Sequence, residues 1–233
     1  MKAGKQMLGT IVNAATIIIG AGIGLLLKKG IKHSMQATIM DGLGLAVIII
    51  GITGAIKSEN IILVIVSLVL GSMLGEAIDI EDKLEKLGQF VQNRMNSNDQ
   101  NLAKGFVTAS LVYCVGAMAI VGSLEAGIQG NYETLFAKSM LDGISAIIFA
   151  STLGIGVAFS SVPVFLYQGS ITLLANVVKD VFTAPLVTEL SAIGGVLIIA
   201  IGINLLGLKK IKVGNMLPAI LVPIIYFLIK GFF

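Results

Sequence analysis

The sequence predicts an all-α protein, a transmembrane helical bundle of about eight spans. Of its 233 residues, 56% are hydrophobic and only 12% are charged, and the mean hydropathy is +0.97. A water-soluble domain of this size could not bury so much apolar side chain. Apolar runs long enough to cross a bilayer recur along the chain, and the spans must be helices because lipid leaves backbone polar groups no other partners.

The runs place the spans one after another with mostly short connections. The expected spans are 7–27, 35–56, 60–78, 105–127, 134–158, 162–179, 186–208 and 214–230. The first ends at Lys28-Lys29-Gly30 without a small-residue cleavage site, so we expect a retained helix and not a signal peptide. Pro163 and Gly169 interrupt the sixth span, which leaves seven spans if that one is re-entrant.

The distribution of basic residues predicts the orientation, because cytoplasmic loops are enriched in Lys and Arg. Ten basic residues follow the odd-numbered spans: Lys28, Lys29, Lys32, Lys83, Lys86, Arg94, Lys104, Lys209, Lys210 and Lys212. Five lie on the other side: Lys2, Lys5, Lys57, Lys179 and Lys230. A multi-pass protein with both termini outside is expected.

One longer polar segment, 81–104, then lies in the cytoplasm. Apolar residues recur at helical spacing around its start, at Ile80, Leu84, Leu87 and Val91, opposite acidic and basic ones. This pattern is typical of an amphipathic helix on the membrane surface. A solvated connector is the favoured interpretation, and a docking site for a partner is the alternative.

A short repeat relates the second span to the fifth. Thr38-Ile-Met-Asp-Gly-Leu43 resembles Ser139-Met-Leu-Asp-Gly-Ile144, so Asp41-Gly42 corresponds to Asp142-Gly143. Each set of three spans would have opposite topology, as in the inverted repeats of many transporters. The predicted division of the single membrane domain, 1–233, is repeat one at 7–80, the linker at 81–104, repeat two at 105–180 and a C-terminal helix pair at 186–230. Chance similarity is the alternative, since Asp-Gly is also a turn signal.

Four acids within the expected spans are candidates for a functional site: Asp41, Glu125, Asp142 and Glu189. A carboxylate at the centre of a membrane helix costs about 2.5–3.5 kcal/mol, so such acids normally face a partner or an aqueous pathway. Glu125 and Glu189 are near span ends, where contact with interfacial water is an equal alternative. Lys138 lies one turn before Asp142, and an ion pair between them is the structural alternative to a functional acid.

Neutral polar residues gather in the second half of the chain, and Asn13 adds one in the first span. They are Asn131, Ser139, Ser145, Ser151, Thr152, Ser160, Ser161, Gln168, Ser170, Thr172 and Asn176. The interrupted sixth span is expected to be a discontinuous helix that lines a site, and interhelical hydrogen bonding is the alternative for any single residue. The pairs Gly20 and Gly24, and Gly71 and Gly75, are spaced for close helix packing.

Several function classes lack their signatures. One cysteine, Cys114, and one histidine, His33, cannot form a disulfide framework or a Cys/His metal cluster. No basic run indicates nucleic acid as a partner. No nucleophile elbow, zinc motif or phosphate loop indicates an enzyme, although paired aspartates leave a membrane-embedded hydrolase open. No cofactor is expected.

Longer motifs resemble one family. The segments LGTIVNAATIIIGAGIGLLL, CVGAMAIVGSLEAG, KSMLDGISAIIFASTLGIGV and FSSVPVFLYQGSITLLA are similar to family 554 of the domains of unknown function, and the resemblance extends over essentially the whole chain. It implies a polytopic protein of the bacterial inner membrane with an expected transport role and no established substrate. The matching positions are Asn13, Glu125, Lys138, Ser139, Asp142, Gly143, Ser151, Pro163, Tyr167, Gln168 and Gly169.

The expected function is that of a small secondary transporter or channel for an ion or small solute. Asp142 and Asp41 are the predicted proton or cation sites; the other candidates are Glu125, Asn13, Ser139, Gln168 and Lys138. The lipid bilayer and the transported species are the expected partners, and a homodimer is a further expectation. The alternative is a non-transporting membrane scaffold or sensor that acts through the amphipathic segment.

Overall fold

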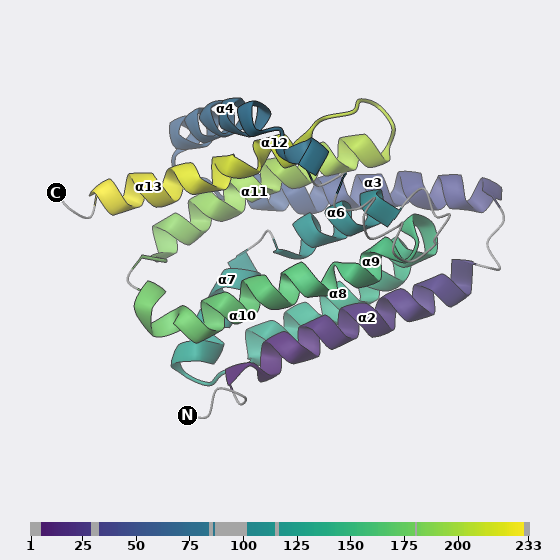
Figure 1. The fold of residues 1–233 in the computed structure, drawn as a ribbon, viewed down its shortest axis with the longest axis horizontal. Coiled ribbons are helices and arrows are strands. Elements are labelled where there is room, and N and C mark those ends of the chain that lie inside the picture. Colours follow the sequence, from purple (N-terminus) through teal and green to yellow (C-terminus); the bar gives the residue numbers. More distant parts are fainter. Residues whose placement is uncertain are drawn as a thin grey trace. The chain divides into compact units, whose positions relative to one another are not determined.

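A computed structural model describes residues 6–28, 33–83, 86, 102–114, 117–179 and 181–230, and within them every regular element is helical (Figure 1). The helices are α2 (Leu8–Lys28), α3 (His33–Ala55), α4 (Ile61–Ile78), α6 (Leu102–Cys114), α7 (Ala117–Ile128), α8 (Glu133–Leu153), α9 (Gly156–Phe159), α10 (Ser161–Val178), α11 (Ala184–Leu205), α12 (Val213–Met216), η1 (Leu217–Ile220) and α13 (Leu221–Lys230). In the described part, seven spans are long and apolar enough to cross a membrane, or eight with α6 and α7 as one bent span. The all-helical membrane fold is therefore confirmed.

The chain forms two compact units. The first comprises residues 1–40, 86–114 and 118–178, and holds α2, α6, α8, α9, α10 and nearly all of α7; the second comprises 41–85, 115–117 and 179–233, and holds most of α3 together with α4, α11, α12, η1 and α13. Neither unit is continuous in sequence, because helices from distant segments pack together. The first unit contains most of the candidate residues.

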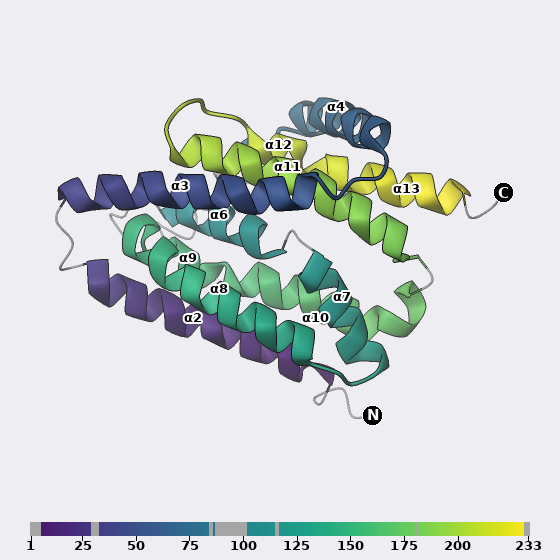
Figure 2. The same ribbon diagram turned by 180° about the vertical axis from the view of Figure 1, so that it is seen from behind.

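In the first unit, α2 and α8 run side by side in the same direction (Figure 2). A Cβ at Gly20 would overlap the carbonyl of Gly143, and one at Gly24 would overlap the carbonyl of Ile147. Residue numbers therefore increase in the same direction along both helices, so the helices are parallel. The predicted close packing through Gly20 and Gly24 is confirmed.

The bent pair α6 and α7 runs along α8 in the opposite direction. Gly105 in α6 packs against Leu153 at the end of α8, whereas Gly122 in α7 packs against Leu135 near its start. The two axes differ by 59°. Together, α6 and α7 therefore cover the whole length of α8, as a single broken span does.

The expected interruption of the sixth span is wrong. The helix α10 continues from Ser161 to Val178 through both Pro163 and Gly169. Pro163 is the third residue, in the first turn, where a missing N–H costs no helical hydrogen bond. The helical chain instead breaks before Pro163, where α8 ends at Leu153 and Gly154 has a φ of 79°.

The second unit is assembled through glycines on two helix pairs. Antiparallel α3 and α11 bring Gly44 next to Gly202 and Gly51 next to Gly195. On α4, a Cβ at Gly71 would overlap the backbone of η1, and one at Gly75 would overlap the backbone of α12. The second predicted glycine pair is thus also confirmed.

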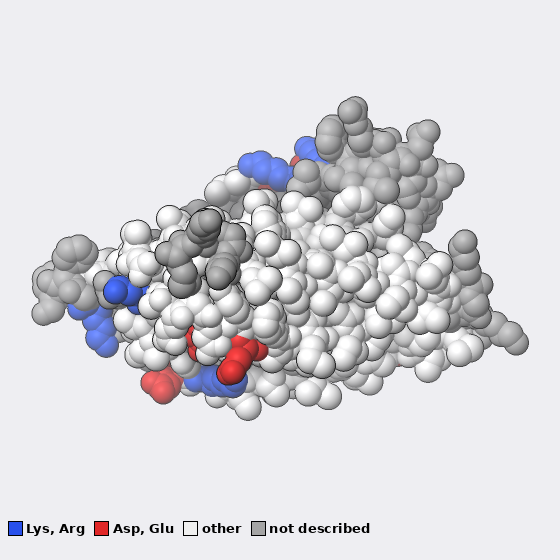
Figure 3. Space-filling model, turned by 90° about the horizontal axis from the view of Figure 1, so that it is seen from below, with Lys and Arg blue, Asp and Glu red and all other residues white. Residues whose placement is uncertain are grey.

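The surface agrees with a membrane-embedded chain. Figure 3 shows a face dominated by uncharged side chains, with acidic and basic ones confined to small groups near its margins. Large apolar side chains are exposed on the candidate spans, among them Ile19, Leu26, Ile62 and Leu166. Such an apolar surface is stable in contact with lipid and not with water.

Two further expectations stay predictions. The inverted repeat that would relate Asp41 to Asp142 is one of them, and the two residues belong to different units. Most of the amphipathic segment 81–104 lies outside the described residues, including its apolar positions Leu84, Leu87 and Val91.

Candidate functional site around a buried ion pair

The first unit contains a buried ion pair at the middle of α8. The Nζ atom of Lys138 donates to Oδ2 of Asp142 at 2.7 Å and to Oδ1 at 2.9 Å, and both side chains are only 8% exposed. One helical turn separates the two residues, which places both on one face. The alternative raised from the sequence, pairing of Lys138 with Asp142, is therefore observed.

Two amides from other helices complete this cluster. Nδ2 of Asn13, on α2, donates to Oδ2 of Asp142 at 3.0 Å and to Oε1 of Gln168, on α10, at 3.2 Å. Since the carboxylate can only accept, the Asn13 amide must present its NH₂ group to Asp142. The other amide atoms, Asn13 Oδ1 and Gln168 Nε2, have no hydrogen-bond partner among the described residues.

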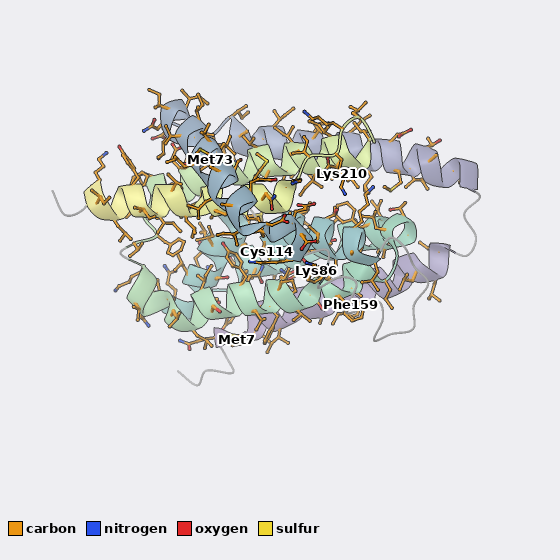
Figure 4. All side chains as sticks on the ribbon, turned by 45° about the horizontal axis from the view of Figure 1, so that its top comes forward. Met7, Met73, Lys86, Cys114, Phe159 and Lys210 are labelled. Atoms are coloured by element: carbon orange, nitrogen blue, oxygen red, sulfur yellow. The ribbon has the colours of Figure 1, made fainter. Side chains whose placement is uncertain are left out.

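The broken span passes this cluster at the end of α6. Cys114 is the last residue of α6 (Figure 4). The neighbouring Tyr113 accepts a hydrogen bond from Ser145 on α8 at 3.4 Å. The end of α6 therefore lies beside the stretch of α8 that carries the ion pair.

Three hydroxyls in the same unit are buried without a partner. Thr10, Ser123 and Thr172 are at most 1% exposed, and their hydroxyl oxygens make no hydrogen bond with any described residue. An unsatisfied buried polar group costs about 1–3 kcal/mol, so an unmatched set calls for an explanation. Sequence reasoning named Thr172 only among general polar residues and missed Thr10 and Ser123.

The remaining candidates from this unit have local bonds. The hydroxyl of Ser139 donates to the carbonyl of Leu135 in its own helix at 2.6 Å. Glu125 accepts from the hydroxyl of Thr134 at 2.7 Å, which ties the end of α7 to the start of α8. Both residues therefore shape the helices around the cluster and do not touch the ion pair.

The acids of the second unit differ from Asp142. Glu189 is 3% exposed and accepts bonds from the backbone N–H groups of Glu59 and Asn60 at 2.9 and 3.0 Å, and from the Ser58 hydroxyl at 2.7 Å. It anchors the loop before α4. Asp41 is exposed on α3, so it does not share the buried environment of Asp142.

The described residues offer no candidate metal site. They contain no group of three or more His, Cys, Asp or Glu side chains that could hold a metal ion. The cluster instead offers one paired carboxylate, one ammonium and two amides, which suits the exchange of protons or hydrogen bonds.

Comparison with known proteins identifies the family of the chain. The model of the family described as "Protein of unknown function (DUF554)" matches residues 8–228. The chain belongs to the DUF554 family. All four residues of the cluster lie within the matched DUF554 region.

Two relatives extend over nearly the full DUF554 chain. It is 40% identical over 231 residues to the "Uncharacterized membrane protein YdfK" of Bacillus subtilis, with 97% of this chain and 98% of the relative covered. It is 29% identical over 221 residues to the "Uncharacterized protein YqgA" of Escherichia coli, with 93% and 94% covered. No solved structure matches this DUF554 chain significantly.

Proposed function

We propose that this chain is a small secondary transporter or channel for an ion or small solute, and that the Lys138–Asp142 pair is its ion-exchange site. One observation carries this proposal: a buried ion pair with unused amide groups, at the centre of a span and beside a broken helix. Ionisable groups inside a membrane are costly, and they commonly mark proton relays and ion pathways.

The geometry favours a proton over a metal cation as the exchanged ion. The ammonium of Lys138 already occupies the position between both Asp142 oxygens, so a metal cation would have to displace it. A proton needs only one carboxylate lone pair. When it binds, Asp142 becomes neutral, the pair gains one positive charge, and Lys138 loses its counter-ion.

That loss supplies the driving force for a conformational change. A buried ammonium without a counter-ion is unstable in a low-dielectric environment, so the protonated state favours rearrangement or hydration around Lys138. Asn13 and Gln168 would follow, because their bonds depend on the Asp142 carboxylate. Protonation of one group is thereby coupled to α2, α8 and α10.

Charge movement in proteoliposomes tests this function without a known substrate. A pH jump on a supported membrane should give a transient current from the wild-type protein, and Asp142→Asn should abolish it. The matched control is Asp41→Asn, which changes an exposed acid of the other unit and should keep the current. An unchanged current in Asp142→Asn would remove Asp142 from the mechanism.

A double variant separates transport from structure. Lys138→Met with Asp142→Asn removes both charges, so it should fold while carrying no current. If the folded double variant keeps the wild-type current, the pair is only structural and the proposal is wrong.

A further inference from the structure

The unpartnered polar groups are not scattered through the first unit. Thr10 lies one turn before Asn13 on α2, and Thr172 lies one turn after Gln168 on α10. The two helices approach each other at Gly169, where an added Cβ would meet Met7 and come within 3.9 Å of Thr10. Both hydroxyls therefore lie on the same side of the Asn13–Gln168 bond.

That side leads to the membrane surface at which α2 begins. Gln6 donates to the carbonyl of Gly127 at 3.1 Å, and a Cβ at Gly127 would overlap the carbonyl of Thr172. The start of α2, the end of α7 and the end of α10 thus meet there. Figure 4 labels Met7 at this end of α2.

The third hydroxyl belongs to the same track. Ser123 lies one turn before Gly127, on the face of α7 that packs against α10. One turn of helix rises about 5.4 Å, so Thr10 and Thr172 lie roughly that much closer to the surface than Asn13 and Gln168.

The opposite direction is closed by different means. Beyond the pair, α2 packs on the α8 backbone through Gly20 and Gly24. The hydroxyls toward that end already have partners, since each donates to a carbonyl of its own or the preceding helical segment: Ser151, Thr152, Ser160 and Ser161. Unused hydrogen-bonding capacity is therefore one-sided.

We propose that Thr10, Ser123 and Thr172, with the free ends of Asn13 and Gln168, form a water-access path that connects the Lys138–Asp142 pair to one membrane surface only. In the structure these hydroxyls are buried, so the path is closed. On opening, water would satisfy the five unpartnered atoms and carry protons to Asp142. The basic-residue distribution predicts this surface to be the outer one.

The inference rests on the proposed function for its purpose, but its test needs no transport. In a Cys114→Ala background, which removes the native thiol, Thr172→Cys places a near-isosteric thiol on the path. The matched control is Leu174→Cys, close to the surface on the same helix and 52% exposed on an apolar face. The probe is a membrane-impermeant, positively charged methanethiosulfonate, which reacts with thiolate in water.

We expect the thiol at 172 to react at least about tenfold faster than the one at 174, because thiolate forms in water and not in lipid. Reaction should occur only from the surface at which α2 begins, shown with right-side-out and inverted vesicles. Thr10→Cys is the second reporter if Thr172→Cys does not fold.

Equal rates at 172 and 174, or equal reaction from both surfaces, would overturn the path. Its failure is distinguishable from failure of the proposed function. If the path residues are labelled but no pH-jump current is seen, the water-access path stands and the ion-exchange site is rejected. If a current is seen but no path residue is labelled, the ion-exchange site stands and the path is rejected.

Discussion

Removing one charge of the Lys138–Asp142 pair should destabilise the protein far more than removing both. At the observed 2.7 Å, the Coulomb energy is about 6 kcal/mol at an effective dielectric constant of 20. Desolvation of both ions offsets most of this gain. Deleting one partner leaves the other charge buried and costs about 3–5 kcal/mol, whereas deleting both is nearly neutral.

Asp142→Asn and Lys138→Met should therefore each lower the midpoint of thermal unfolding by about 6–20 °C, from about 2–4 °C per kcal/mol for a chain of this size. The double variant should lie within a few degrees of the wild type. Because the chain has no Trp, far-ultraviolet circular dichroism in detergent is the suitable probe. Asp41→Asn, on an exposed position, is the matched control and should change stability by less than about 0.5 kcal/mol.

Two results would refute this reasoning. If Asp142→Asn alone leaves the unfolding midpoint unchanged, the pair is not buried as the structure shows. If the double variant is as unstable as either single one, the loss comes from packing or from Asn13, and not from an uncompensated charge.

Three smaller predictions concern packing and loops. Gly24→Ala should destabilise by about 1–3 kcal/mol because its Cβ overlaps α8, whereas Gly22→Ala, with open space around it, should be neutral or gain about 0.5–1 kcal/mol of helix propensity; equal effects on the unfolding midpoint would contradict the parallel α2–α8 contact. Glu189→Ala should lower the free energy of unfolding by about 2–4 kcal/mol, because it leaves the donors in the loop before α4 without an acceptor. The control is Glu59→Ala at an exposed position, and a loss as small as the control's would show that Glu189 does not anchor this loop. A hydrogen bond to Glu76 raises the pKa of Lys212 above its ordinary 10.5. The stability that this bond contributes is therefore present below pH 10.5 and is lost as the pH rises through the folded-state pKa. Above pH 10.5, the unfolding midpoint of Lys212→Gln should then fall less steeply with pH than that of the wild type.

Hydropathy and helical spacing were sufficient for the elements of the fold. The expected spans agree with the helices to within a few residues in most cases, since apolar length is a local property. The pairing of Lys138 with Asp142 was also accessible, because residues four apart in a helix share a face. Local spacing thus identified half of the cluster.

The partners from other helices could not be deduced in the same way. Asn13 and Gln168 are 155 positions apart, and their contact depends on the order in which α2, α8 and α10 pack. The break was expected within α10 because Pro is a strong local signal. Its position in the first turn makes it harmless, whereas the bend lies between α6 and α7. Glu189 was named as an acid near a span end, but its bonds to the loop before α4 carry no sequence signature.

The direction of the helices in the first unit also bears on membrane topology. Parallel α2 and α8 require an even number of membrane crossings from the start of one to the start of the other. The candidate spans α2, α3 and α4 supply three, so α6 and α7 must together supply the fourth. With α6 and α7 as one span, we therefore predict eight crossings with both termini on one side, and the excess of Lys and Arg in the odd-numbered connections predicts that this side is the outside. Reporter fusions at the two ends should therefore give the same sidedness. Opposite sidedness would mean that α6 and α7 turn back, and that the parallel contact of α2 with α8 does not form in the membrane.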